Sequence, residues 1–170
     1  MANHWSNIVK FRGNQEQVNA LLESIKGDDG RLVDFNKITP MPRWIYGYDP
    51  SVTGISREDK EKYGKENISL NWRREHWGTK WNAYEMDYNA EKNELFFRTA
   101  NGAAPYLFQK LAWIYPEVEI TYECYDTTDP FFGNIYTFEM KDTDFEETSR
   151  PMLTEEELRE ELPELFEDID

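Results

Sequence analysis

Residues 94–124 read ELFFRTANGAAPYLFQKLAWIYPEVEITYEC, and this stretch decides the fold class. The apolar residues of 94–100 predict a strand, and the turn after it leads into a helix that begins near Pro105, a residue favoured in the first helical turn. Pro116 ends this helix, whose buried face carries Leu107, Phe108, Leu111 and Tyr115. The last segment is a strand with one buried face, formed by Val118, Ile120, Tyr122 and Cys124. Strand, helix and strand in this order predict an α+β domain.

The flanking segments extend this pattern on both sides. Residues 6–12 predict a strand, and a helix follows with apolar residues at helical spacing, namely Val18, Leu21, Leu22 and Ile25. Residues 82–89 alternate in polarity and predict a hairpin with 94–100, and 134–141 predict a last strand. The order is therefore strand, helix, insertion, strand, strand, helix, strand, strand. It contains the split pattern of ferredoxin-like folds, in which one antiparallel sheet packs two helices on one face.

The predicted ferredoxin-like domain covers residues 1–141, with an insertion at about 43–67. The insertion begins with a loop at 46–50, which reads YGYDP. A short charged helix is predicted after Ser56, where Asp59 stands at the position that closes a capping box. Residues 142–170 are a separate, acidic and amphipathic tail.

This tail holds most of the net charge of −15. Residues 142–170 carry a net charge of −11, which leaves −4 for residues 1–141. Thr154 and Glu157 predict a capping box at the start of a tail helix. One apolar stripe then follows, formed by Leu158, Leu162, Leu165, Phe166 and Ile169. The helix either packs on its own domain or docks on a partner; the remaining alternative is a solvated, disordered end.

The residue types do not indicate a cofactor, a metal site or a catalytic group. The two histidines, His4 and His76, and the single Cys124 are far apart in the sequence, whereas a metal site needs several ligands at matched spacing. Phosphate-loop, nucleophile-elbow and HExxH motifs are absent, and the 34 acidic residues always permit a carboxylate pair without indicating catalysis. No segment approaches the roughly 20 apolar residues of a membrane span. With a reduced thiol and no secretory signal, we expect a cytoplasmic protein.

Residues 71–82, NWRREHWGTKWN, are the most unusual segment of the chain. In a structural interpretation, three tryptophans wedge between sheet and insertion, and Asn71, Thr79 and Asn82 hold an irregular loop together. In a functional interpretation, tryptophans beside cations bind a base, a nucleotide, a phosphate or an acidic peptide. The candidate binding residues are Trp72, Arg73, Arg74, His76, Trp77, Thr79, Lys80 and Trp81.

Three sequence strings resemble one known family. They are NHWSN at residues 3–7, DFNKITPMP at 34–42 and WGTKWNA at 77–83, and together they resemble the uncharacterised YubB-type ferredoxin-like proteins of phages, plasmids and integrated elements. The resemblance covers roughly residues 3–141 and implies a ferredoxin-like body and a mobile-element origin. It implies no catalytic residues, and the long acidic end is not part of the family pattern.

Three functional hypotheses follow. The first is a non-enzymatic accessory protein that binds a host macromolecule, most simply a protein with a basic surface, through its acidic tail; it would inhibit a host defence or nucleic-acid-processing protein. The second is a module that binds a nucleotide or single-stranded nucleic acid through residues 71–82. The third is an enzyme of unknown class. The acidic charge disfavours nucleic-acid binding by the molecule as a whole.

Overall fold

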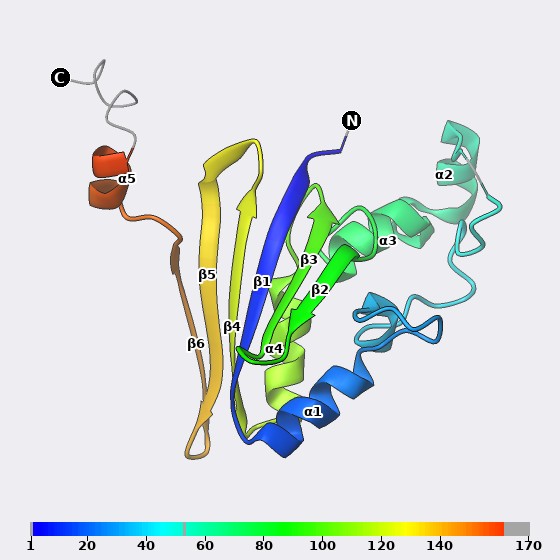
Figure 1. Ribbon diagram of the computed structural model, residues 1–170. Helices are drawn as coiled ribbons and strands as arrows, with labels where there is room; N and C mark the ends of the chain where they lie inside the picture. The colour runs from blue at the N-terminus through cyan, green and yellow to red at the C-terminus, as the bar shows by residue number, and fades with distance from the viewer. Residues whose placement is uncertain (1, 53, 162–170) are drawn as a thin grey trace.

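The computed structural model describes residues 2–52 and 54–161, except for the side chains of 130–132, 155, 158 and 161. Its centre is one antiparallel sheet of six strands within this described part, in the order β2-β3-β1-β4-β5-β6 (Figure 1). The strands are β1 (His4–Gly13), β2 (Tyr84–Asn89), β3 (Glu94–Ala100), β4 (Val118–Asp126), β5 (Asp129–Lys141) and β6 (Asp144–Pro151). The α+β class predicted from the sequence is confirmed.

Two long helices pack on this sheet, and shorter helices lie in the connections. The long ones are α1 (Gln15–Ser24) and α4 (Pro105–Ile114). The shorter ones are α2 (Arg57–Tyr63), α3 (Ser69–His76), α5 (Glu155–Glu161) and the 3-10 turns η1 (Phe35–Lys37) and η2 (Lys65–Asn67). The side chain of Asn14 caps α1 by accepting from the backbone N–H of Gln17 at 3.0 Å. Among the described residues no helix has both the length and the apolar character needed to cross a membrane.

The core lies between one face of the sheet and the two long helices. Residues at alternate positions of the strands are buried there, as the period of two requires. They join Leu21 of α1 and Phe108 of α4 in one apolar cluster, in which Val9, Phe97 and Tyr122 are fully buried. The other face of the sheet is more open and polar; there the ammonium of Lys10 pairs with the Glu123 carboxylate at 2.9 Å.

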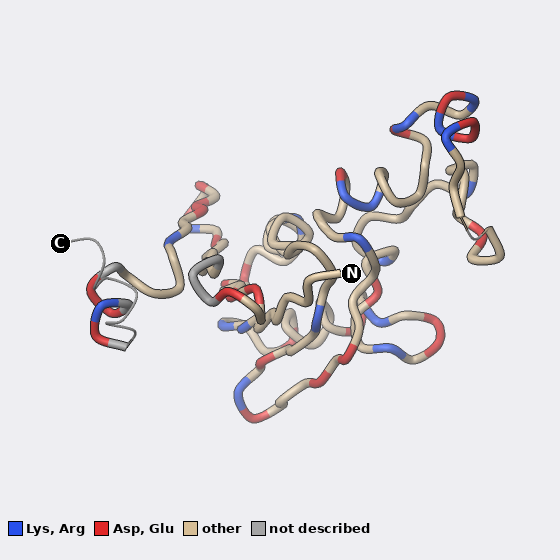
Figure 2. Tube along the Cα trace, turned by 90° about the horizontal axis from the view of Figure 1, so that it is seen from above, with Lys and Arg blue, Asp and Glu red and all other residues tan. Residues whose placement is uncertain are grey.

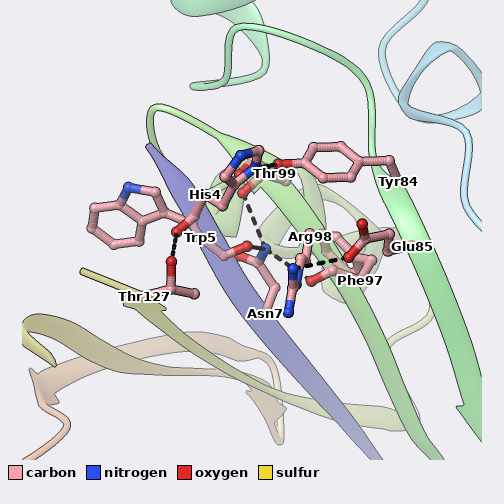
Figure 3. A network of polar contacts seen from close by, with 9 residues as sticks. All are labelled: His4, Trp5, Asn7, Tyr84, Glu85, Phe97, Arg98, Thr99 and Thr127. Carbon is pink, nitrogen blue, oxygen red and sulfur yellow. Dashed lines mark hydrogen bonds and ion pairs between the residues drawn. The ribbon is translucent and has the colours of Figure 1, made fainter. Parts of the chain in front are cut away.

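A polar network is buried in this core at the end of the sheet nearest His4. Asn7 is fully buried, and its amide nitrogen donates to the carbonyl of Phe97 (3.2 Å) and the hydroxyl of Thr99 (3.0 Å) (Figure 3). Its amide oxygen accepts from the phenol of Tyr122 at 2.6 Å, and that phenol accepts from the backbone N–H of Ala104 at 2.9 Å. The network therefore ties β1, β3, β4 and the start of α4 together without leaving these groups unpaired.

The C-terminal region differs from its prediction in one respect. Residues 144–151, which the sequence assigned to the tail, form β6 and pair with β5 along the edge of the sheet. The capping box is present: Thr154 N donates to Glu157 Oε2 (2.7 Å), and Glu157 N donates to Thr154 Oγ (3.2 Å). The apolar stripe lies outside what is described, since residues 162–170 and the side chain of Leu158 are not placed.

The short charged helix that the sequence predicts after Ser56 is confirmed as α2. Ser56 and Asp59 form a reciprocal capping box at the start of α2. The ring of Tyr46 stacks on that of Tyr63 with centroids 4.4 Å apart, and the backbone N–H of Tyr46 donates to Asn67 at 2.9 Å. These contacts join the loop before α2 to the turn after it. The insertion therefore has a defined structure beside α3, at the β2 edge of the molecule (Figure 1).

Candidate functional site

The tryptophan-rich segment 71–82 has two structurally different halves. Its first half belongs to the helix α3, which the sequence interpretation as an irregular loop missed. Arg73 and Arg74 occupy the last turn of α3, where their positive charge complements the helix dipole, and His76 is the last residue of the helix. Its second half, residues 77–82, is an irregular connection of turns and bends that leads to β2. The change from helix to loop sends neighbouring side chains of this segment in different directions.

Trp72 and Trp77 are part of the core. Both side chains are buried, and their rings meet edge to face with centroids 5.7 Å apart. The indole N–H of Trp77 donates to the carbonyl of Thr39 at 2.8 Å, and its ring lies 5.7 Å from that of Phe35. These contacts satisfy the one polar atom of the indole, as expected for a buried tryptophan. Both residues therefore position the segment.

The turn after Trp77 depends on a close backbone crossing. Gly78 has φ of +82°, and a Cβ there would stand 2.6 Å from the carbonyl oxygen of Ala103. Gly102 approaches Gly78 in the same way, with a hypothetical Cβ 2.6 Å from the Gly78 carbonyl oxygen. Thr79 is fully buried, and its hydroxyl donates to the Trp81 carbonyl at 2.6 Å.

Asn82 connects this segment to residues 34–42. Its amide oxygen accepts from the backbone N–H of Phe35 (2.9 Å), and its amide nitrogen donates to the Asp34 carboxylate (2.8 Å). Together with the Trp77–Thr39 bond, these contacts make the strings 34–42 and 77–83 direct neighbours. Both strings are thus parts of one structural unit.

Several residues of the segment line a cavity of about 620 Å³, which we call the cationic cleft. Arg73, Arg74, Lys80 and Trp81 lie on its wall, and Lys60 of α2 joins them from the insertion. No acidic residue is among the described residues of its lining. An aliphatic wall completes it, formed by Pro50, Val52, Ile55, Ile68 and Leu70. Its volume lies within the range of about 300–1,000 Å³ typical of small-molecule sites.

The four cations of the cleft carry uncompensated charge. Within the described part of the chain, none of them has a carboxylate oxygen within 4.0 Å. Burial lowers the pKa of the Arg73 guanidinium from its ordinary value, but an arginine remains charged. Arg73 and Lys80 are partly buried, whereas Lys60 and Arg74 are exposed. A partly buried cation without a counterion favours binding of an anion, because the anion restores the charge balance.

Local contacts orient the Arg73 side chain and the backbone of Lys80, and they bring the Lys80 ammonium to Trp81. Nε of Arg73 donates to the carbonyl of Lys80 at 2.7 Å, which sets the direction of the guanidinium. The backbone N–H of Lys80 donates in turn to Ala100 in β3 at 2.9 Å. The ammonium of Lys80 lies 5.1 Å from the ring centre of Trp81, a side chain that is 43% exposed. An exposed indole beside anchored cations can stack on a planar ring and neutralise a phosphate at once.

His76 lies at a different cavity of about 290 Å³, on whose wall Trp77 also lies. Its imidazole stacks on Trp72 with centroids 4.4 Å apart. The predicted site residues are therefore divided between two cavities, while Trp72 and Thr79 line neither of them. The sequence missed Lys60, because it lies 13 residues before Arg73 in a helix that reads as an ordinary charged surface.

The other histidine, His4, has a structural environment near β2. The phenol oxygen of Tyr84 hydrogen-bonds to Nδ1 of His4 and donates to the carbonyl of Thr99 at 3.2 Å, and the hydroxyl of Thr127 donates to the His4 carbonyl at 2.8 Å (Figure 3). Cys124 is buried, which raises the pKa of its thiol to about 11 and makes it a poor nucleophile. The described residues contain no group of three His, Cys, Asp or Glu placed to hold a metal ion.

The chain was compared with protein-family models, curated proteins and solved structures. No family model, curated protein or solved structure matches it.

Proposed function

We propose that this protein is a non-enzymatic binding module that takes a nucleotide into the cationic cleft. One observation carries the proposal: four cations without counterions and the exposed Trp81 surround one cavity that has no acid among its described lining residues. Arg73, Arg74, Lys60 and Lys80 would bind the phosphates, since guanidinium and ammonium groups form charge-assisted hydrogen bonds to them. Trp81 or the aliphatic wall would contact the base.

The charge distribution favours a mononucleotide or a single nucleotide at the end of a strand over a long polymer. The sheet order puts β6, which carries Asp144, Glu146 and Glu147, at the edge opposite β2. In Figure 2 the segment that leads to the C-terminus carries mainly acidic residues. A strand of nucleic acid that ran across the molecule would meet this acidic surface, whereas a mononucleotide in the cleft would not.

Titration with matched ligands tests this proposal. A nucleoside triphosphate, inorganic triphosphate, the free nucleoside and a single-stranded oligonucleotide are each titrated by calorimetry. We expect the nucleoside triphosphate to bind most tightly, because it alone offers both phosphates and a base at mononucleotide size. A stronger oligonucleotide signal would instead favour single-stranded nucleic acid as the ligand.

Two exposed side chains serve as test positions. Arg74→Ala removes a charge-assisted contact and should weaken binding about tenfold or more. Trp81→Ala should weaken binding of the nucleoside triphosphate by about five- to a hundredfold, and binding of inorganic triphosphate far less. Lys92→Ala, at an exposed lysine outside the cleft, is the matched control. Absence of binding, or equal effects of Arg74→Ala and Lys92→Ala, would reject the cleft as the site.

We propose as a second candidate that the acidic end binds a basic surface of a host macromolecule. The observation in its favour is that β6 and α5 form an exposed edge rich in carboxylates. Affinity capture from host lysate should compare the full chain with a chain ending at Leu153. This end point keeps β6 and the bond from Met152 N to the Gly133 carbonyl (3.0 Å), which removal of all of 142–170 would destroy. Unchanged capture by the shortened chain would exclude a role for residues 154–170 and leave the carboxylates of β6 as the binding surface.

We propose further that the chain contains a ferredoxin-like unit, formed by β1, α1, β2, β3, α4 and β4. We also propose that the chain is related to the YubB-type family of mobile elements. The neighbour order β2-β3-β1-β4, with a helix after β1 and another after β3, supports the first part. The contacts between residues 34–42 and 77–83 support the second, since two of the three strings that carry the resemblance serve one structural unit. An experimental structure of this chain with a different strand order would overturn the first part, and one of a family member with a different strand order would overturn the second.

A further inference from the structure

The cavity beside His76 differs from the cationic cleft in its chemistry. Four aromatic side chains line it, each from a different part of the fold: Trp5 of β1, Trp77 after α3, Tyr106 of α4 and Tyr136 of β5. Two of the rings, those of Tyr106 and Tyr136, meet edge to face with centroids 6.3 Å apart. We call this cavity the aromatic cage.

The charged groups of the aromatic cage also differ from those of the cleft. Its described lining contains the carboxylate of Glu75 and no lysine or arginine. The only other titratable group that reaches it from α3 is His76, whose ring is held against Trp72. The helix α3 thus turns Arg73 and Arg74 toward one cavity, and Glu75 and His76 toward the other.

The start of α4 has few free backbone N–H groups that could bind an anion in this cavity. Pro105 has no N–H, and the N–H of Ala104 already donates to the phenol of Tyr122 at 2.9 Å. Two backbone donors that an uncapped helix end would normally present are therefore missing or used. Besides its aromatic rings and the Glu75 carboxylate, the described lining of the cavity holds only three further polar side chains, those of His76, Cys124 and Asn134.

We propose that the aromatic cage binds an alkylated ammonium group, such as choline or a methylated lysine side chain. Aromatic rings attract a cation placed over their faces, and a group of such rings with a nearby carboxylate is suited to a quaternary ammonium. The volume of about 290 Å³ fits a group of this size and excludes a large ligand. This site is independent of the nucleotide proposed for the cationic cleft.

The test compares choline with 3,3-dimethylbutan-1-ol, its neutral isostere with carbon in place of nitrogen. Both are titrated into the full chain at about pH 8, where imidazole side chains are generally neutral, and the indole N–H signals of Trp5 and Trp77 are followed by NMR. We expect choline to bind about tenfold more tightly than the isostere, since the two differ only in charge. Equal affinities, or no shift of these signals with choline, would overturn the proposal.

Variants at exposed positions separate ring, charge and hydroxyl effects. Tyr106 is 63% exposed, so its substitution should not disturb folding. Tyr106→Leu should weaken choline about three- to fivefold, whereas Tyr106→Phe, which keeps the ring, should bind choline as the unmodified chain does. Glu75→Gln should weaken choline binding about threefold and leave the affinity for the isostere unchanged. Equal binding by all three variants would place the cation outside the cage and reject the site.

A last comparison identifies the source of the ammonium group. A short peptide with one trimethyllysine is titrated beside choline. If the peptide binds more tightly than choline and Tyr106→Leu weakens its binding, the natural source is a partner protein. Tighter binding of choline supports a small molecule. If Tyr106→Leu binds choline and the peptide as tightly as the unmodified chain does, the aromatic cage is not the binding site.

Discussion

Trp77 offers the clearest test of whether the tryptophan-rich segment holds the fold or forms a binding surface. Its side chain is 4% exposed, contacts Phe35 and Trp72, and donates its indole N–H to Thr39 at 2.8 Å. Trp77→Ala removes this packing and leaves a cavity, which typically costs about 3–5 kcal/mol. The lost hydrogen bond adds about 1 kcal/mol. The expected loss of about 4–6 kcal/mol is a large part of an ordinary unfolding free energy of about 5–15 kcal/mol.

Two further variants separate the contributions. Trp77→Phe keeps an aromatic ring and should cost only about 1–3 kcal/mol, from the lost N–H and the smaller area. Trp81→Ala, at a side chain that is 43% exposed, should change stability by less than about 1 kcal/mol.

The assay is urea unfolding followed by far-ultraviolet circular dichroism, which does not depend on the tryptophan that is removed. The midpoints should rank unmodified chain, Trp81→Ala, Trp77→Phe and Trp77→Ala in descending order. For a chain of this size each 1 kcal/mol corresponds to about 2–4 °C in melting temperature, so Trp77→Ala should melt about 10–20 °C lower. A Trp77→Ala variant within about 1 kcal/mol of the unmodified chain would refute the structural role. So would a Trp81→Ala variant that is equally destabilised.

Three other predictions concern the core and its close contacts. Tyr122→Phe leaves both partners of the buried phenol unpaired and should cost about 2–5 kcal/mol in urea unfolding; Tyr106→Phe, at an exposed tyrosine, should cost almost nothing, and equal costs would contradict the network. Gly78→Ala places a Cβ 2.6 Å from the Ala103 carbonyl at a positive φ, so thermal unfolding should show a loss of about 1–3 kcal/mol, and a stabilised variant would be inconsistent with this crossing. The buried Cys124 thiol has a pKa raised to about 11 and keeps its proton to higher pH in the folded chain than in the unfolded one. Iodoacetamide at about pH 8 should therefore label the folded chain at least a hundredfold more slowly than the chain in urea, and comparable rates would show that the thiol is accessible.

Local sequence determined the elements whose partners lie within a few residues or whose pattern is strongly periodic. The alternation from Val118 to Cys124 predicts β4, because only a strand puts every second side chain on one face. The capping box of Ser56 and Asp59 predicts the start of α2, because its donors and acceptors lie three residues apart. The turn between 89 and 93 predicts the hairpin for a similar reason.

Elements that depend on distant partners escaped the sequence pattern. β6 reads DFEETSRP, which has no buried face of its own, and it is a strand because β5 supplies its hydrogen bonds. The sequence does not predict α3, because the helix has only eight residues and only Ser69 and Trp72 of them are buried, so no apolar stripe marks it.

The chemistry of the two cavities likewise depends on tertiary structure. The sequence alone determined that residues 71–82 concentrate tryptophans and cations, and that the acidic charge lies near the C-terminus. Tertiary structure decided that two of these tryptophans support the core, that Lys60 from the insertion joins Arg73 and Lys80, and that Glu75 faces a separate aromatic cage. The physical reason is that a helix turns each residue by about 100° from the last, so neighbours in sequence such as Arg74 and Glu75 serve different surfaces, whereas packing brings together cations that the sequence keeps apart.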